Sequence, residues 1–170
     1  MAIIGGVAVA FHGNPRLTND VDAIVFVDES KLAEFLKLAS KHGIIPRIAG
    51  AVEFAQINRV LLLKDKATGT GIDVALGALA FEQRMLNRAR PVRAGGLNLP
   101  VACAEDITVM KAFAQRGKDL ADIESMLEAN PKLDLNLVRR ELTELAELRE
   151  APEILTEFES LLAKWRKRVD

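Results

Sequence analysis

Acidic residues interrupt two apolar, strand-like segments of this chain, and any fold has to accommodate them. Val21 to Val27 is short, β-branched and nearly continuously apolar, which predicts a strand covered on both faces, and Asp20 and Asp22 stand at its start. Asp73 lies in a second such segment, Gly71 to Leu76. A charge inside an apolar strand is expensive unless it is paired or metal-bound, so these carboxylates indicate a site.

Asp20 and Asp22 are two residues apart, and side chains at that spacing in a strand share one face. Their mutual repulsion is tolerable if one of them is protonated or if a cation neutralises them. A hard ion such as Mg²⁺ prefers carboxylate oxygens and substrate phosphates, and Asp73 would supply a third carboxylate. An isolated D-x-D is more often a surface turn before a strand, so the pair alone does not decide between the two.

The residues ahead of Asp20 favour an anion-binding site. Gly5 and Gly6 follow a short apolar stretch and can open a helix whose free N–H groups face a phosphate, although two glycines also suit a tight turn. Arg16 and Thr18 come next, where a guanidinium can meet phosphate oxygens or form a salt bridge with the acidic pair.

The organisation of the chain predicts an α+β protein with a core over residues 1–103 and a helical subdomain over 104–170. In the first part we expect a helix capped by Ser30 and ended by Gly43, a short strand from Ile44 to Ile48, a hairpin formed by Val52 to Lys64 and Gly71 to Leu76, and a second hairpin around Gly95 and Gly96. In the second part we expect four helices, at Glu105 to Arg116, Leu120 to Ala129, Leu135 to Arg149 and Glu153 to Arg168.

Composition excludes several classes of protein. The 170 residues are 49% hydrophobic, enough to fill a core, and the net charge of −1 gives no global field toward nucleic acid or membrane. The single cysteine, Cys103, excludes an internal disulfide, and no apolar run approaches the ~18 residues of a membrane span. We therefore expect a cytoplasmic protein without a membrane partner.

The string G-G-x-A-(x)4-G-x-x-R-x-T-x-D-x-D, Gly5 to Asp22, resembles the signature of nucleotidyltransferases of the DNA polymerase β superfamily. A second block, Met110 to Ile123, resembles an element of the abortive-infection (AbiEii-type) nucleotidyltransferase toxins. The resemblance implies a polymerase-β-like core with a mixed sheet. The family usually has a helix and a full strand ahead of the glycine pair, whereas only Met1 to Ile4 precede it here, so we expect a short first strand.

The resemblance also implies a reaction: transfer of a nucleoside monophosphate from an NTP to an acceptor hydroxyl, with release of pyrophosphate. In the family pattern, Asp20, Asp22 and Asp73 hold two Mg²⁺ (or Mn²⁺) ions, and Gly5 and Gly6 cradle the phosphates. The toxin subgroup adds an RNA acceptor, such as a tRNA 3′ end, and an antitoxin protein as partner. A small molecule or a protein remains an alternative acceptor, and a non-catalytic nucleotide-sensing or partner-binding domain remains an alternative function.

Two basic features stay open at this stage. Lys111 is placed either to reach phosphate or to meet the acidic cluster, whereas Asp119 and Asp122 fit the start of the next helix. The run Lys164 to Arg168 fits RNA binding, but cations in a last helical turn also offset the helix dipole. A Rossmann dehydrogenase is disfavoured, since G-x-G-x-x-G and the acid about twenty residues later are absent in the required form.

Overall fold

The computed structural model describes residues 1–15 and 17–169. These residues divide into two compact units. The first contains residues 1–8 and 17–102, and the second contains residues 9–15 and 103–169.

A seven-stranded sheet forms the centre of the first unit, with strand order β3-β4-β5-β2-β1-β7-β6. Strands β2 and β5 are parallel, as are β1 and β7, and the other neighbouring pairs are antiparallel. The sheet is therefore mixed, and the α+β fold class expected from the sequence is confirmed. The strands are β1 (Ala2–Ile4), β2 (Asp20–Val25), β3 (Ile44–Pro46), β4 (Val60–Asp65), β5 (Gly71–Leu76), β6 (Arg90–Ala94) and β7 (Leu97–Val101).

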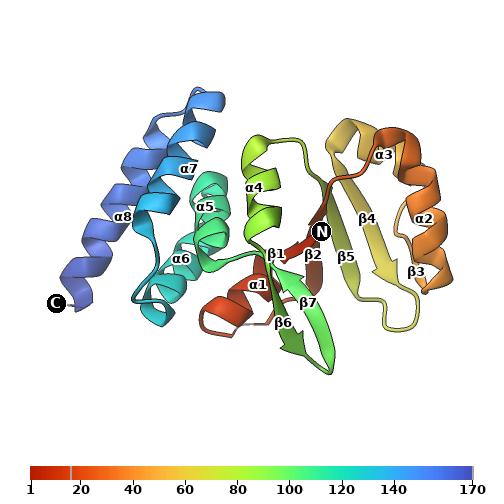
Figure 1. The fold of residues 1–170 in the computed structure, drawn as a ribbon, viewed down its shortest axis with the longest axis horizontal. Coiled ribbons are helices and arrows are strands. Elements are labelled where there is room, and N and C mark those ends of the chain that lie inside the picture. Colours follow the sequence, from red (N-terminus) through yellow and green to blue (C-terminus); the bar gives the residue numbers. More distant parts are fainter. Residues whose placement is uncertain (16, 170) are drawn as a thin grey trace. The chain divides into compact units, whose positions relative to one another are not determined.

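One face of this sheet is apolar because every second residue of β2, β4 and β5 points toward it. Val25, Leu61 and Val74 belong to a buried cluster on that face. Helix α2 (Leu32–Lys41) lies beside β3, and helix α3 (Ala51–Asn58) lies beside β4 (Figure 1). They contribute Leu32 and Ala55 to the same cluster. The intervening residues of these strands face the other way, and Asp22 and Asp73 are among them.

Three helical segments complete the first unit or begin in it. Helix α1 (Gly5–His12) starts directly after β1, so the glycine pair opens a helix as predicted, and β1 is a short strand of three residues. A 3₁₀ turn, η1 (Glu29–Lys31), precedes α2. Helix α4 (Ala80–Arg88) links β5 to β6 and was not predicted from the sequence.

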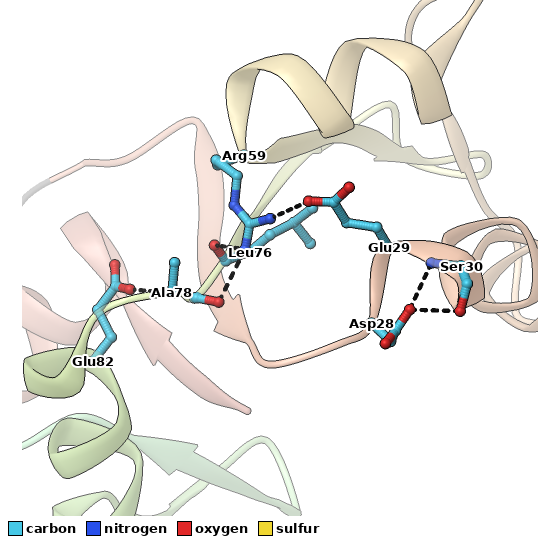
Figure 2. A network of polar contacts seen from close by, with 8 residues as sticks. Asp28, Glu29, Ser30, Arg59, Leu76, Ala78 and Glu82 are labelled. Atoms are coloured by element: carbon cyan, nitrogen blue, oxygen red, sulfur yellow. Dashed lines mark hydrogen bonds and ion pairs between the residues drawn. The ribbon is translucent and has the colours of Figure 1, made fainter.

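Arg59 connects three segments around the end of β5 (Figure 2). Its Nη1 donates to Glu29 Oε1 at 2.7 Å, and its Nη2 donates to the backbone carbonyls of Leu76 and Gly77 at 3.1 Å each. Nearby, Glu82 Oε2 accepts from the backbone N–H groups of Ala78 and Leu79 and closes the start of α4. These bonds hold the segment through which the chain leaves β5.

Two local predictions are wrong. Residues 52–58 form helix α3 rather than a strand, because Val52 and Ala55 meet the apolar face at helical spacing, and left-handed residues Gly50 and Arg59 flank the helix. Ser30 is not a helix cap: Asp28 Oδ1 instead accepts from the Ser30 N–H at 2.8 Å, and α2 begins at Leu32. The hairpins β4–β5 and β6–β7 are confirmed.

Four helices form most of the second unit: α5 (Ala104–Ala114), α6 (Gly117–Ala129), α7 (Leu135–Leu148) and α8 (Glu153–Val169). They lie close to the four predicted segments. The predicted break between the first two is present, since Gln115 adopts φ 52° and ends α5. Apolar side chains from all four helices are buried in this unit: Ile107, Ile123, Leu142, Ile154 and Leu162. Among the described residues, no helix has the length and apolar character needed to cross a membrane.

Candidate active site

Asp22 and Asp73 stand side by side on neighbouring parallel strands. Asp22 of β2 is the register partner of Asp73 of β5, so their side chains lie on the same face of the sheet, opposite the apolar cluster. Asp20 is two residues before Asp22 and shares that face, beside its register partner Gly71. The structure thus brings the three predicted carboxylates to adjacent positions on one sheet face.

Gly5 leaves room for the Asp22 carboxylate. A Cβ atom at Gly5 would lie 1.9 Å from Asp22 Oδ2, and Gly5 has φ +63°, a backbone conformation that other residues rarely adopt. The carboxylate therefore lies against the first residue of α1, where a helix carries partial positive charge. Gly6, the second residue of that helix, is buried.

Gly71 leaves room for Asp20 in the same manner. A Cβ atom there would lie 2.1 Å from Asp20 Oδ1 and 2.9 Å from Arg47 Nη1. The absence of a side chain at Gly71 therefore allows a carboxylate and a guanidinium to come together over β5.

Arg47 is a site residue that sequence reasoning missed. Its backbone N–H donates to the Leu62 carbonyl at 2.8 Å, and Leu62 is the register partner of Asp73. The Arg47 side chain forms an ion pair with Asp73 through Nη2 and Oδ1. Arg47 is 26 residues from Asp73 in the chain, so only the strand register, which the sequence does not reveal, could have identified the pair.

The electrostatics of Asp73 reflect these neighbours. Burial raises the pKa of the Asp73 carboxyl, the Arg47 guanidinium opposes that rise, and the negative charges of Asp22 and Asp20 add to it. The overall direction is upward, so the ionised form of Asp73 is disfavoured in the folded protein. Additional positive charge at this point would stabilise the ionised cluster.

The remaining predicted residues lie as follows. Thr18 is exposed, and its Oγ1 donates to the Asp20 carbonyl at 3.1 Å, so it supports the start of β2. Arg16 lies outside the described residues. Lys111 belongs to the second unit, where its Nζ contacts Asp119 Oδ1 at 2.8 Å and Asp122 Oδ2 at 2.7 Å, and its side chain is 5% exposed.

The basic run at the end of α8 has partners within the second unit. Arg168 Nη2 lies 2.5 Å from Glu124 Oε1 on α6. The pKa of Glu159 is lowered chiefly by its bond from Arg139, with a smaller contribution from Arg166. Part of the charge of this run therefore serves contacts between helices.

Comparison with known proteins assigns the family. A family profile described as "Nucleotidyltransferase of unknown function (DUF6036)" matches residues 1–170. The chain belongs to this family. It is accordingly a nucleotidyltransferase, an enzyme of the transferase class that uses a nucleotide substrate. The narrower resemblance to abortive-infection toxins stays a prediction.

Two solved structures share the fold. A nucleotidyltransferase-like antigenic protein from Paracoccidioides brasiliensis aligns with a TM-score of 0.50 and 20% identity over 91% of this chain and 83% of that one. The antibiotic-resistance factor ANT(2'')-Ia aligns with a TM-score of 0.55 and 15% identity over 89% of this chain and 84% of that one. No curated protein matches the sequence. At these identities the likeness establishes the polymerase-β-like fold and leaves the substrates open.

The carboxylates fit the metal ions on which nucleotidyltransferases typically depend. Hard divalent cations take oxygen ligands, and Asp20, Asp22 and Asp73 offer only carboxylate oxygens. Within residues 1–15 and 17–169, no three His, Cys, Asp or Glu side chains are already grouped as a metal site. Asp73 is instead paired with Arg47 through one of its two carboxylate oxygens, Oδ1.

Proposed function

We propose that this nucleotidyltransferase transfers a nucleoside monophosphate from an NTP to an acceptor hydroxyl, using Asp20, Asp22 and Asp73 with two Mg²⁺ or Mn²⁺ ions. The observation that carries the proposal is the register of β2 and β5. It sets Asp22 beside Asp73, with Asp20 on the same face and Gly5 against the Asp22 carboxylate. A non-catalytic nucleotide-binding domain has no need of three costly carboxylates in this arrangement.

Each residue has a defined part in this proposal. Asp20 and Asp22 would hold the ions, which when bound would neutralise phosphate charge and favour the leaving pyrophosphate. The acceptor oxygen attacks the α-phosphorus, the bond from that phosphorus to the pyrophosphate oxygen breaks, and Asp73 accepts the proton of the hydroxyl.

The start of α1 would bind the phosphates of the NTP. The first N–H groups of a helix have no intrahelical partners, and Gly5 and Gly6 allow phosphate oxygens to approach the backbone closely. Arg16 and Thr18 would contact the nucleotide, and Arg16 would balance charge that develops in the transition state, roles that rest on the sequence pattern. Lys111 receives no role here, since Asp119 and Asp122 bind its amine.

For the acceptor we propose RNA, and a tRNA 3′ end in particular. The support is the resemblance of Met110 to Ile123 to the toxin subgroup, together with the exposed cations Lys164, Arg166 and Lys167 on α8. A toxin-like activity of this kind would be held in check by an antitoxin protein. A small molecule or a protein as acceptor is the competing outcome.

The acceptor can be identified with labelled substrate. Each α-labelled NTP would be incubated with the protein, Mg²⁺ and total RNA, and separately with a small-molecule extract, with Asp22→Asn as the inactive control. Label on RNA supports the proposal, and label only on protein or a small molecule rejects the RNA acceptor.

The contribution of the α8 cations to RNA binding can be measured apart from catalysis. If two of them contact phosphates, Lys164→Ala with Lys167→Ala should flatten the slope of log affinity against log salt by about 1.4 to 1.8, at roughly 0.7 to 0.9 for each phosphate. Lys31→Ala with Lys37→Ala, which removes two exposed lysines from the first unit, is the matched control and should leave the slope unchanged. Equal slopes for both double variants would remove α8 from the RNA interface.

A further inference from the structure

Arg47 lies next to β4, and its side chain extends across Leu62 of that strand toward the carboxylates of β5 and β2. It follows β3 directly, and its backbone N–H bond to the Leu62 carbonyl extends the pairing of β3 with β4 by one residue. Arg47, Leu62, Asp73 and Asp22 therefore follow one another across four neighbouring segments of the sheet, on the same face. The guanidinium passes over Leu62 to meet Asp73.

The guanidinium lies between carboxylates of β5 and β2. Its Nη2 is paired with Asp73 Oδ1. Its Nη1 and Asp20 Oδ1 both lie within 2.9 Å of the point that a Cβ of Gly71 would occupy. Arg47 thus brings a positive charge between Asp73 and Asp20, which are diagonal neighbours on the two strands.

The ion pair between Arg47 and Asp73 is partly exposed to water and therefore weak. The side chains of Arg47 and Asp73 are 30% and 31% exposed, and an ion pair with that access to water changes an equilibrium constant by at most about fivefold. Asp22 is the register partner of Asp73 and Asp20 is its diagonal neighbour on the same sheet face, so a cation near Asp73 relieves the repulsion among three like charges. A divalent ion does so better than a single guanidinium.

We propose that Arg47 is a positioning residue that neutralises Asp73 while the site is without metal and yields the carboxylate when a divalent cation binds. This inference rests on the proposed function, since it takes the three aspartates as the metal ligands. It predicts direct competition: the guanidinium and the metal ion would both bind the Asp73 carboxylate, so removing Arg47 should strengthen metal binding.

The competition can be measured as Mn²⁺ affinity, by the loss of the free Mn²⁺ electron paramagnetic resonance signal, with no nucleotide and no turnover. The proteins are the full chain and its variants Arg47→Ala, Arg47→Lys, Lys64→Ala and Asp22→Asn. Lys64 is the matched control. It lies on the same sheet face, as register partner of Gly71, so its loss removes an equal charge from the same surface.

We expect Arg47→Ala to bind Mn²⁺ about fivefold more tightly than the wild type, in line with the loss of a partly exposed ion pair. Lys64→Ala should change the affinity by less than about twofold, because an effect of charge alone is screened by salt. Arg47→Lys should fall between the two, since an ammonium keeps the charge but loses the planar fork. Thermal melts of each variant in EDTA check that it is folded.

Two results separate this inference from the proposed function. If Asp22→Asn loses Mn²⁺ while Arg47→Ala binds no more tightly than Lys64→Ala, the competition is wrong and the metal site stands. If the wild-type protein binds no Mn²⁺ that Asp22→Asn removes, the metal site and the competition both fail.

A second measurement observes Arg47 directly. Its side-chain Nε–Hε signal in a nitrogen-15 NMR spectrum can be assigned by its absence from Arg47→Lys. During a Mg²⁺ titration that signal should shift with the same midpoint as Mg²⁺ binding in the wild type. A signal that stays in place at saturating Mg²⁺ would overturn the proposal.

Discussion

Gly5 and Asp22 are fitted to one another across β1 and β2: a Cβ atom on Gly5 would lie 1.9 Å from Asp22 Oδ2. Ile4, the residue before Gly5, is the antiparallel register partner of Asp22, so the turn from β1 into α1 falls beside the carboxylate. The glycine is required both by this contact and by its φ of +63°. One member of the glycine pair, Gly5, and one member of the acidic pair, Asp22, thus form one local structure.

This fit predicts a specific defect in Gly5→Ala. The new methyl group must displace the Asp22 carboxylate, so we expect Mn²⁺ affinity and nucleotidyl transfer to fall at least about tenfold, since a small misplacement in a catalytic site can cost about 100-fold in rate. Gly43→Ala is the control, because Gly43 has φ +77° but a Cβ added there would meet no atom within 4 Å. It should lose about 1 to 2 kcal/mol of stability from backbone strain and keep its activity.

The two glycine variants are compared by urea unfolding and by transfer assays. Equal activity in Gly5→Ala and Gly43→Ala would mean that the position of the Asp22 carboxylate does not matter for the reaction.

Lys111 is predicted to stabilise the second unit. Its amine lies between two buried carboxylates, Asp119 and Asp122, and breaking a buried ion pair by removing one partner costs about 3 to 5 kcal/mol. Lys111→Met should therefore lower the free energy of unfolding by about that amount. Lys118→Met, at an exposed position, should change it by less than about 0.5 kcal/mol. Matching urea midpoints for the two variants would show that the buried pairs carry no net stability.

Asp73 is predicted to make the metal-free protein less stable as the pH rises. Its folded pKa lies above the ordinary aspartate value of 3.8, so between those two values the folded chain holds more protons than the unfolded chain. The stability that the protonated Asp73 carboxyl confers is fully present below pH 3.8, and it is lost as the pH rises through the pKa of Asp73 in the folded protein. In EDTA, Asp73→Asn should therefore equal or exceed the wild type at pH 7, and its advantage should shrink as the pH falls toward 4.

The stabilisation that Asp119 provides is predicted to depend on pH in the opposite direction from that of Asp73. Burial raises the pKa of Asp119, but bonds from Arg116 and Lys111 outweigh burial and hold it below its usual value. The stability that the ionised Asp119 carboxylate confers is fully present above pH 3.8, and it is lost as the pH falls through the lowered pKa of Asp119 in the folded protein. Asp119→Asn should be destabilised at pH 7, with a deficit that narrows in acid. Urea unfolding from pH 4 to 7 compares the two variants, and a large loss of stability in Asp73→Asn at pH 7 would mean that its carboxylate is structural.

The parts of the structure that the sequence predicted are those with strong local signals. Asp22 and Asp73 were recognised because charges stand out in apolar strands, and the β4–β5 hairpin because Gly69 separates two strand-like segments. Residues 52–58 were misassigned because an apolar run of that length suits a strand or a helix, and only packing against the apolar face decides.

Arg47 could not have been found from the sequence. Its partnership with Asp73 depends on the register of three strands, and register is set by side-chain packing across the whole sheet. Nothing in the residues around Arg47 marks it as different from other basic residues at the end of a short strand. Lys111 was singled out by the sequence, but its acidic partners depend on how α5 and α6 pack.

Nucleotidyl transfer by Asp22→Asn tests the central claim most directly. The substitution keeps the shape of the side chain and removes the charge that the proposed mechanism requires. With α-labelled NTP, Mg²⁺ and the identified acceptor, we expect label transfer by the wild type and a fall of at least about 1,000-fold in Asp22→Asn, with a thermal midpoint in EDTA equal to or above that of the wild type. Transfer by a folded Asp22→Asn within about threefold of the wild-type rate would contradict the assignment of this sheet face as the active site.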